Sequence, residues 1–138
     1  MSHYQVIKSQ LRERRHIMAA IESAGLEAQI APQGQTIALK DWRGNTAGHA
    51  SIVFDVPVRY GGSVKIGLVE NKDGSWSWAG DGDYLYDSSP KSITGKIAMW
   101  AAAHEAKELV ESQGHHMSLS LDAATGLVLG EYTMEVSA

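Results

Sequence analysis

Aromatic and acidic side chains gather in one short stretch of the chain, "DGSWSWAGDGDYLYD", residues 73–87. Trp76 and Trp78 alternate with serines, so on a strand both indoles leave the same face. They either cover the neighbouring strand as core, where aromatic residues are favoured, or form a stacking platform for a flat ligand. Tyr84 and Tyr86 alternate like strand residues, or lie on a loop able to cover such a ligand.

An arginine lies on the apolar side of the first predicted helix. Arg14 projects from the centre of that face, where it can bind a phosphate or carboxylate with its planar fork. It can equally extend to solvent or pair with a carboxylate. Lys8 adds positive charge at the same end, although "RERR" with Arg12 and Arg15 is also typical of a solvated basic face. The apolar positions are Leu11, Ile17, Met18 and Ile21.

A histidine occupies a similar position on the second predicted helix. His104 falls inside the apolar arc, close to Ile97 and Trp100 on the helical wheel. It is either a hydrogen-bonded, half-buried histidine or a polar group that points into a pocket beside the Trp100 indole. Small-ligand pockets are mostly apolar with a few placed polar groups, which this neighbourhood would supply.

Metal and cofactor sites are not indicated by the spacing of possible ligands. Asp81, Asp83 and Asp87 lack the glycine at position six and the glutamate at position twelve of a calcium loop. "HEAKE" pairs His104 with Glu108 but lacks the second histidine of a zinc-hydrolase helix. We therefore expect no metal and no cofactor.

No nucleophile motif occurs either. The chain has no G-x-S-x-G turn, no phosphate-binding loop and no dinucleotide fingerprint. The remaining histidines are His3, His16, His49, His115 and His116, and their spacing indicates no set of metal ligands. His115 and His116 are adjacent, so at the start of a strand they should point to opposite faces.

Composition limits the class of protein. The 138 residues suit one domain, here residues 1–138, that can bury a core without cross-links. A net charge of −4 offers no strong field for nucleic acid, and cysteine is absent. The start has no signal-peptide pattern, and the longest apolar run, "IAMWAAA", is too short for a membrane span. We expect a soluble, cytoplasmic protein with no membrane and no specific nucleic-acid partner.

The periodicity predicts two helices and several strands. Ser9 is a candidate cap for the first helix, which should end at Gly25, and Ser92 caps a second that stops at Gly114. "NKDG" between two apolar runs is a strong hairpin signal. The expected strands are residues 3–8, 26–30, 36–42, 49–58, 64–70 and 75–80, with two more, "HHMSLSLD" and "GLVLGEYTMEV", joined by "AATG".

Element order favours an α+β fold, a mostly antiparallel sheet with two helices on one face, since each helix has one apolar stripe to bury. "IESAGLEAQI" and "VESQGHHMSLSL" share the pattern apolar-Glu-Ser-x-Gly before a strand. This internal echo suggests ferredoxin-like βαβ and αββ halves.

Several stretches together resemble the plastid and cyanobacterial Ycf35 (DUF1257-like) family, whose function is unknown. They are the opening Met-Ser-His-aromatic, "IKSQLR", the hairpin "VKIGLVENKDGSWSW" and the helix-turn-strand "AAAHEAKELVESQGHHMSLSLD". "GDGDYLYD" fits only part of the aromatic tract that follows the hairpin in that family. The resemblance implies an α+β sheet fold, and relatives of the family also occur in bacteriophages.

The leading functional hypothesis is a small non-enzymatic protein that binds a small anionic, nucleotide-like ligand. Its site would comprise Arg14, Trp100, His104, Trp76, Trp78, Tyr84, Tyr86 and Lys8. Because phages carry relatives, it would sequester a nucleotide-derived signal from a host pathway, in the host cytoplasm, as an anti-defence protein. The alternatives are a protein-interaction module that forms homo-oligomers, and a cyclic-nucleotide phosphodiesterase that uses His104, His115 or His116.

Overall fold

The computed structural model describes residues 4–41, 43–58, 61–86 and 89–133. Predictions that fall on His3, Trp42, Asp87 or the end of the last strand lie outside these residues. Contacts divide the chain into two compact units, each made of two segments. The sheet unit comprises residues 1–12 and 26–88, and the helix unit comprises residues 13–25 and 89–138.

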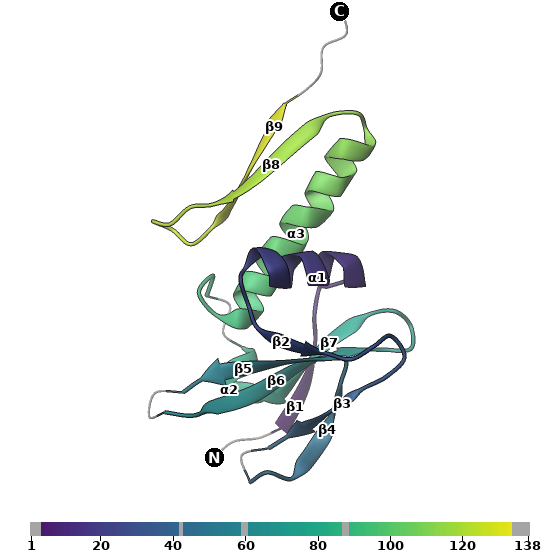
Figure 1. The fold of residues 1–138 in the computed structure, drawn as a ribbon, viewed down its shortest axis with the longest axis vertical. Coiled ribbons are helices and arrows are strands. Elements are labelled where there is room, and N and C mark those ends of the chain that lie inside the picture. The colour runs from purple at the N-terminus through teal and green to yellow at the C-terminus, as the bar shows by residue number, and fades with distance from the viewer. Residues whose placement is uncertain (1–3, 42, 59–60, 87–88, 134–138) are drawn as a thin grey trace, which may run out of the picture. The chain divides into compact units, whose positions relative to one another are not determined.

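The sheet unit is built on a five-stranded antiparallel sheet with the order β1-β7-β6-β5-β2 (Figure 1). The predicted "NKDG" hairpin between β6 and β7 is confirmed. The predicted strand 49–58 is divided at Ser51, so its first two residues, His49 and Ala50, belong to a separate hairpin with β3. The strands are β1 (Tyr4–Lys8), β2 (Ala28–Ile30), β3 (Ile37–Lys40), β4 (Thr46–Ala50), β5 (Ile52–Pro57), β6 (Ser63–Glu70) and β7 (Trp76–Asp81).

One face of this sheet, the hairpin face, is partly covered by the β3–β4 hairpin. Leu39 and Ala50 of the hairpin form a buried cluster with Val53 and Ala79 of the sheet. The approach is close at Gly67, where an added Cβ would lie 2.6 Å from the Ala50 Cβ. Glycine is therefore required at this position for the hairpin to lie flat on the sheet.

The opposite face, the tryptophan face, carries the largest buried side chains of the unit. Trp76 and Trp78 leave it from β7, and Phe54 leaves it from β5 with its ring centroid 5.9 Å from that of Trp78. Ile52, Ile66 and Leu68 are buried on the same face.

The helix unit contains α1 (Arg14–Ser23), α3 (Ile93–Ser112) and a hairpin of β8 (His116–Leu121) and β9 (Val128–Thr133). In Figure 1 α1 crosses α3, and β8 returns alongside α3. The predicted ends of α3 are confirmed, because the Ser92 hydroxyl accepts a hydrogen bond from the Gly95 amide at 3.0 Å and the helix stops before Gly114.

The first helix begins later than the sequence predicts. Its N-cap position is Glu13, whereas the Ser9 hydroxyl donates to the Trp76 carbonyl of β7 at 2.8 Å. The prediction that Ser9 caps the helix is therefore wrong. Its end is confirmed, since Gly25 follows the C-cap with φ +66°, a backbone conformation that glycine adopts without strain.

The α+β class and the mostly antiparallel sheet are confirmed. The observed pairing differs from ferredoxin-like halves, because β1 and β2 lie at opposite edges of the sheet and β8–β9 form a sheet of their own. A short helix, α2 (Gly82–Leu85), also follows β7 where we expected a loop or strand. The prediction that both helices lie on one face of the sheet concerns the position of one unit relative to the other, and it stays a prediction. Among the described residues, no helix has the length and apolar character needed to cross a membrane.

Candidate ligand-binding site

A cavity of about 440 Å³ opens at one end of the hairpin face of the sheet unit. Its walls come from the start of β1, the β3–β4 turn, the start of β6, the end of β7 and α2. The lining residues are Tyr4, Lys40, Asp41, Gly44, Ala47, Ser63, Val64, Lys65, Gly80, Asp81 and Tyr84. Cavities of this size commonly hold small molecules.

Two tyrosines from distant parts of the sequence line this cavity. Tyr4 leaves the hairpin face opposite Asp81, and its hydroxyl lies so close to Gly48 of β4 that an added Cβ would overlap it. Partial burial raises the pKa of the Tyr4 phenol, which keeps it a neutral hydrogen-bond donor. Tyr84 lies on α2, which Asp81 caps by accepting from the Asp83 amide at 3.0 Å.

The charged side chains of the cavity differ in how they are paired. Asp41 accepts hydrogen bonds from the Arg43 and Asn45 amides at 2.9 and 3.0 Å, so its carboxylate holds the β3–β4 turn. Lys65 forms an ion pair with Asp55 across the β5–β6 ladder.

Lys40 is the cation best placed for an external anion. Its ammonium donates to the Thr46 hydroxyl at 3.1 Å, and within the described part of the chain it has no carboxylate partner. The cavity thus combines two aromatic rings, two phenol hydroxyls and a cation with a neutral partner. This arrangement can stack a flat group and hold an anion.

Of the predicted site residues, Tyr84 lies in this cavity and Lys8 lies beside a second hollow of the same face. Tyr86 follows α2 with 65% of its surface exposed and does not line the cavity.

The two tryptophans do not contribute to the cavity. Trp76 and Trp78 are 1% and 5% exposed, and they project from the tryptophan face, opposite to Tyr4 and Lys8. The structure therefore agrees with their role as core rather than as a platform. Gly67 of the neighbouring strand β6 is covered from the hairpin face by Ala50 and Leu39.

The other predicted site residues belong to the helix unit. Trp100 is 8% exposed, and its ring stacks on His104 with centroids 6.0 Å apart. His104 Nε2 lies 2.8 Å from the Ser23 hydroxyl of α1. The pKa of His104 is lowered by burial, and further by the nearby Lys107 and His16. His104 thus has the hydrogen-bonded, half-buried environment that was one of its two predicted roles.

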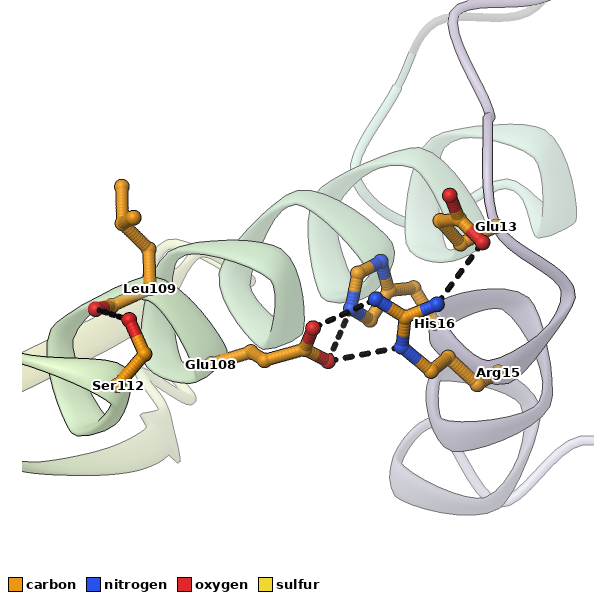
Figure 2. A network of polar contacts seen from close by, with 6 residues as sticks. All are labelled: Glu13, Arg15, His16, Glu108, Leu109 and Ser112. Carbon is orange, nitrogen blue, oxygen red and sulfur yellow. Dashed lines mark hydrogen bonds and ion pairs between the residues drawn. The ribbon is translucent and has the colours of Figure 1, made fainter.

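An ion-pair network joins α1 to α3 (Figure 2). Arg15 donates to Glu108 through Nε at 2.9 Å and through Nη2 at 2.6 Å, and also contacts Glu13. His16 Nε2 lies 2.8 Å from Oε2 of the same carboxylate, the oxygen that also accepts from Arg15 Nε. The hydrogen bonds from Arg15, and next that from His16, lower the pKa of Glu108 to about 2. The network therefore links α1 to α3 through the Glu108 carboxylate.

The sequence predicts Arg14 as the ligand-binding cation of this helix. In the structure Arg14 is half-buried and takes part in an interaction within the protein. The residue that forms the bidentate contact is its neighbour Arg15. His16 and Ala20 lie on the buried side of α1 together with Ile17 and Ile21.

The cavity residues Tyr4, Lys40 and Lys65 were also missed. Tyr4 shares a strand face with Val6, and that alternation was the available signal. Nothing in the sequence indicated that the β3–β4 turn would place Lys40 near it.

No group of three or more His, Asp or Glu side chains in the described part of the chain is arranged to hold a metal ion. No protein-family model, no curated protein and no solved structure matches this chain.

Proposed function

We propose that this chain is a non-enzymatic binding protein that holds a small anionic, nucleotide-like ligand in the tyrosine-lined cavity of its sheet unit. The observation that carries the proposal is the position of Lys40, a cation with only a hydroxyl partner among the described residues, in a cavity that Tyr4 and Tyr84 also line.

The chemistry of the lining supports a ligand with a flat part and an anionic part. A base can stack on a tyrosine ring, an interaction worth about 1–3 kcal/mol per base. An ammonium group binds phosphate as a point charge, which suits Lys40 and, after a shift away from Asp55, Lys65. The phenol hydroxyls can supply hydrogen bonds that fix orientation.

We further propose that such binding sequesters a nucleotide-derived signal in the cytoplasm. This part of the proposal rests on the resemblance to the Ycf35 family and on the occurrence of that family in phages. It predicts tight binding without turnover of the ligand.

Calorimetric titration of the full chain with adenosine 5′-monophosphate (AMP), followed by chromatography of the recovered nucleotide, tests the proposal. Lys40→Ala and Tyr84→Ala should each weaken binding by roughly 10-fold, the effect of about 1.4 kcal/mol. Lys91→Ala removes an equal charge outside the cavity, and Tyr86→Ala removes an exposed ring, so both should leave the affinity unchanged.

Absence of binding by AMP and by the guanosine, cytidine and uridine monophosphates would contradict the proposal. Turnover of a cyclic nucleotide that is lost in His104→Ala would instead support the phosphodiesterase alternative.

A second candidate function, self-association, is favoured by exposed apolar side chains on the β8–β9 hairpin. Leu121, Leu129 and Tyr132 are each about half exposed, and both strands of this two-stranded sheet have an open edge. Light scattering coupled to size-exclusion chromatography should then give a dimer or larger assembly, and Leu129→Lys should give a monomer. A monomeric wild-type chain would contradict this candidate.

A further inference from the structure

A second hollow lies on the hairpin face near the β6–β7 turn. It has a volume of about 500 Å³, and its lining includes Val6, Lys8, Asn71, Lys72 and Ser77. The Asn71 amide donates to the hydroxyls of Ser75 and Ser77, both at 3.0 Å, so this wall is held by its own hydrogen bonds.

This hollow and the tyrosine-lined cavity follow one another along β1. Tyr4, Val6 and Lys8 pair with Asp81, Ala79 and Ser77 of β7, so all three side chains leave the hairpin face. Tyr4 lines the cavity and Val6 lines the hollow. Side chains two residues apart on a strand are separated by roughly 7 Å, so the two spaces are neighbours.

The centre of this line is open and apolar. β1 is an edge strand of the sheet, and Val6 is 58% exposed although it is an aliphatic residue. The β3–β4 hairpin covers the sheet above Ala79 and Val53, next to β1. Val6 therefore forms an exposed floor, and Tyr4 stands beside it, partly exposed, with its hydroxyl against Gly48 of the hairpin.

Lysines lie at both ends of the line, together with the carboxylates of Asp41 and Asp81 at the cavity end. Lys40 lies at the cavity end, and Lys8 and Lys72 lie at the other, where neither has an ion-pair partner among the described residues. The one carboxylate of the hollow, Asp73, accepts hydrogen bonds from the amide and hydroxyl of Ser75, at 3.0 and 2.6 Å. These bonds, and to a smaller extent the charge of nearby Lys8, lower the pKa of Asp73, so its carboxylate is held mainly by its own turn and offsets part of the positive charge of Lys8.

We propose that the two spaces are the ends of one groove along β1, which takes an elongated ligand with an anionic group at each end and a flat or apolar centre. From Tyr4 to Lys8 the strand rises roughly 13 Å, a span that suits a phosphorylated dinucleotide better than a mononucleotide. This inference rests on the proposed function and specifies the ligand class.

An extended peptide that pairs with the open edge of β1 is the competing occupant. Strand addition depends on main-chain groups at the edge and not on cations at the two ends of a face. The placement of Lys40, Lys8 and Lys72 therefore favours the doubly anionic ligand.

The test compares two probes by calorimetric titration of the full chain. The probes are AMP and the dinucleotide pApAp, which carries phosphate at both ends. Lys8→Ala should weaken pApAp binding by about 10-fold through loss of one charge-assisted contact, and should leave AMP binding unchanged. Val6→Glu, an exposed change in the centre of the groove, should have the same selective effect. Lys40→Ala should weaken both probes, and Lys91→Ala neither.

The outcomes separate this inference from the proposed function. If the wild type binds both probes with equal affinity, or if Lys8→Ala does not change pApAp binding, the proposal of one groove is wrong. Binding of AMP would in that case still support the proposed ligand site in the tyrosine-lined cavity. Absence of binding by either probe would overturn both. Binding of a hexaglutamate peptide that survives Lys8→Ala and Lys40→Ala, with no nucleotide binding, would identify the edge of β1 as a peptide site and overturn the groove.

Discussion

The contact between Gly67 and the β3–β4 hairpin allows a direct test of how one wall of the cavity is positioned. A Cβ added at Gly67 would lie 2.6 Å from the Ala50 Cβ and 3.3 Å from the Ile52 carbonyl oxygen. Carbon atoms pack at about 3.5–4.0 Å, so the hairpin would have to move by about 1 Å. Neither neighbouring atom is the end of a flexible side chain, so the strain cannot be relieved by a rotamer change.

We expect Gly67→Ala to lower the free energy of unfolding by about 0.5–2 kcal/mol. Overpacking a core costs about 1–3 kcal/mol, and replacing a strand glycine with alanine returns about 0.5–1 kcal/mol. Ala50→Gly alone is also destabilising, because it removes a buried methyl group. In the double variant the methyl group changes sides, and the clash with the Ala50 Cβ disappears, which leaves only the closer contact with the Ile52 carbonyl oxygen.

Urea unfolding of the wild type, the two single variants and the double variant measures this coupling. The double variant should be more stable than the sum of the single effects predicts, by about 1 kcal/mol, with an unchanged dependence on urea. Additive effects within about 0.5 kcal/mol would show that the hairpin does not lie on the sheet at this position. Gly67→Ala should also weaken AMP binding, since Lys40 and Asp41 move with the hairpin.

Three further predictions concern the helix unit. Ser92→Ala removes the cap of α3 and should lower the free energy of unfolding by about 1 kcal/mol, as measured by urea titration; an unchanged value would contradict the observed bond to Gly95. The pKa of Glu108 is lowered from its ordinary 4.5 to about 2, so its stabilising effect is present above pH 4.5 and is lost as the pH falls toward 2. Glu108→Gln should therefore be less stable than wild type at neutral pH, with a difference that narrows on acidification; a constant difference would refute the bond to Arg15. The pKa of His104 is lowered below its ordinary 6.5 in the folded protein, mainly by burial. The unfolded state therefore binds a proton more readily than the folded state, and the free energy of unfolding should fall as the pH drops through 6.5. Thermal unfolding of His104→Gln should show a weaker dependence over that range, and an identical slope would contradict the burial of the ring.

The sequence correctly predicts those features of the fold that are determined by residues close together in the chain. The cap of α3 by Ser92, the end of α1 before Gly25 and the "NKDG" hairpin depend on a few adjacent residues, and all are confirmed. The start of α1 was misjudged because Ser9 bonds to the Trp76 carbonyl, a partner distant in the sequence.

The pairing of strands and the cavity depend on such distant contacts throughout. The echo after the two helices predicted equivalent halves, yet the strand after α1 joins the main sheet and the strand after α3 does not. Tyr84 was selected for its type, whereas its partner Tyr4 could be recognised only after β1 was placed beside β7. The prediction that Trp76 and Trp78 share one face is confirmed. They lie on the face opposite to the β3–β4 hairpin, and that hairpin could not be placed from the sequence.

Backbone amide spectra of the isotope-labelled full chain, recorded during titration with pApAp, locate the bound ligand residue by residue. We expect the largest shifts at Tyr4, Lys8, Lys40 and Tyr84, with those at Lys8 absent when AMP replaces pApAp. Shifts confined to Trp100 and His104, or to the β8–β9 hairpin, would contradict it.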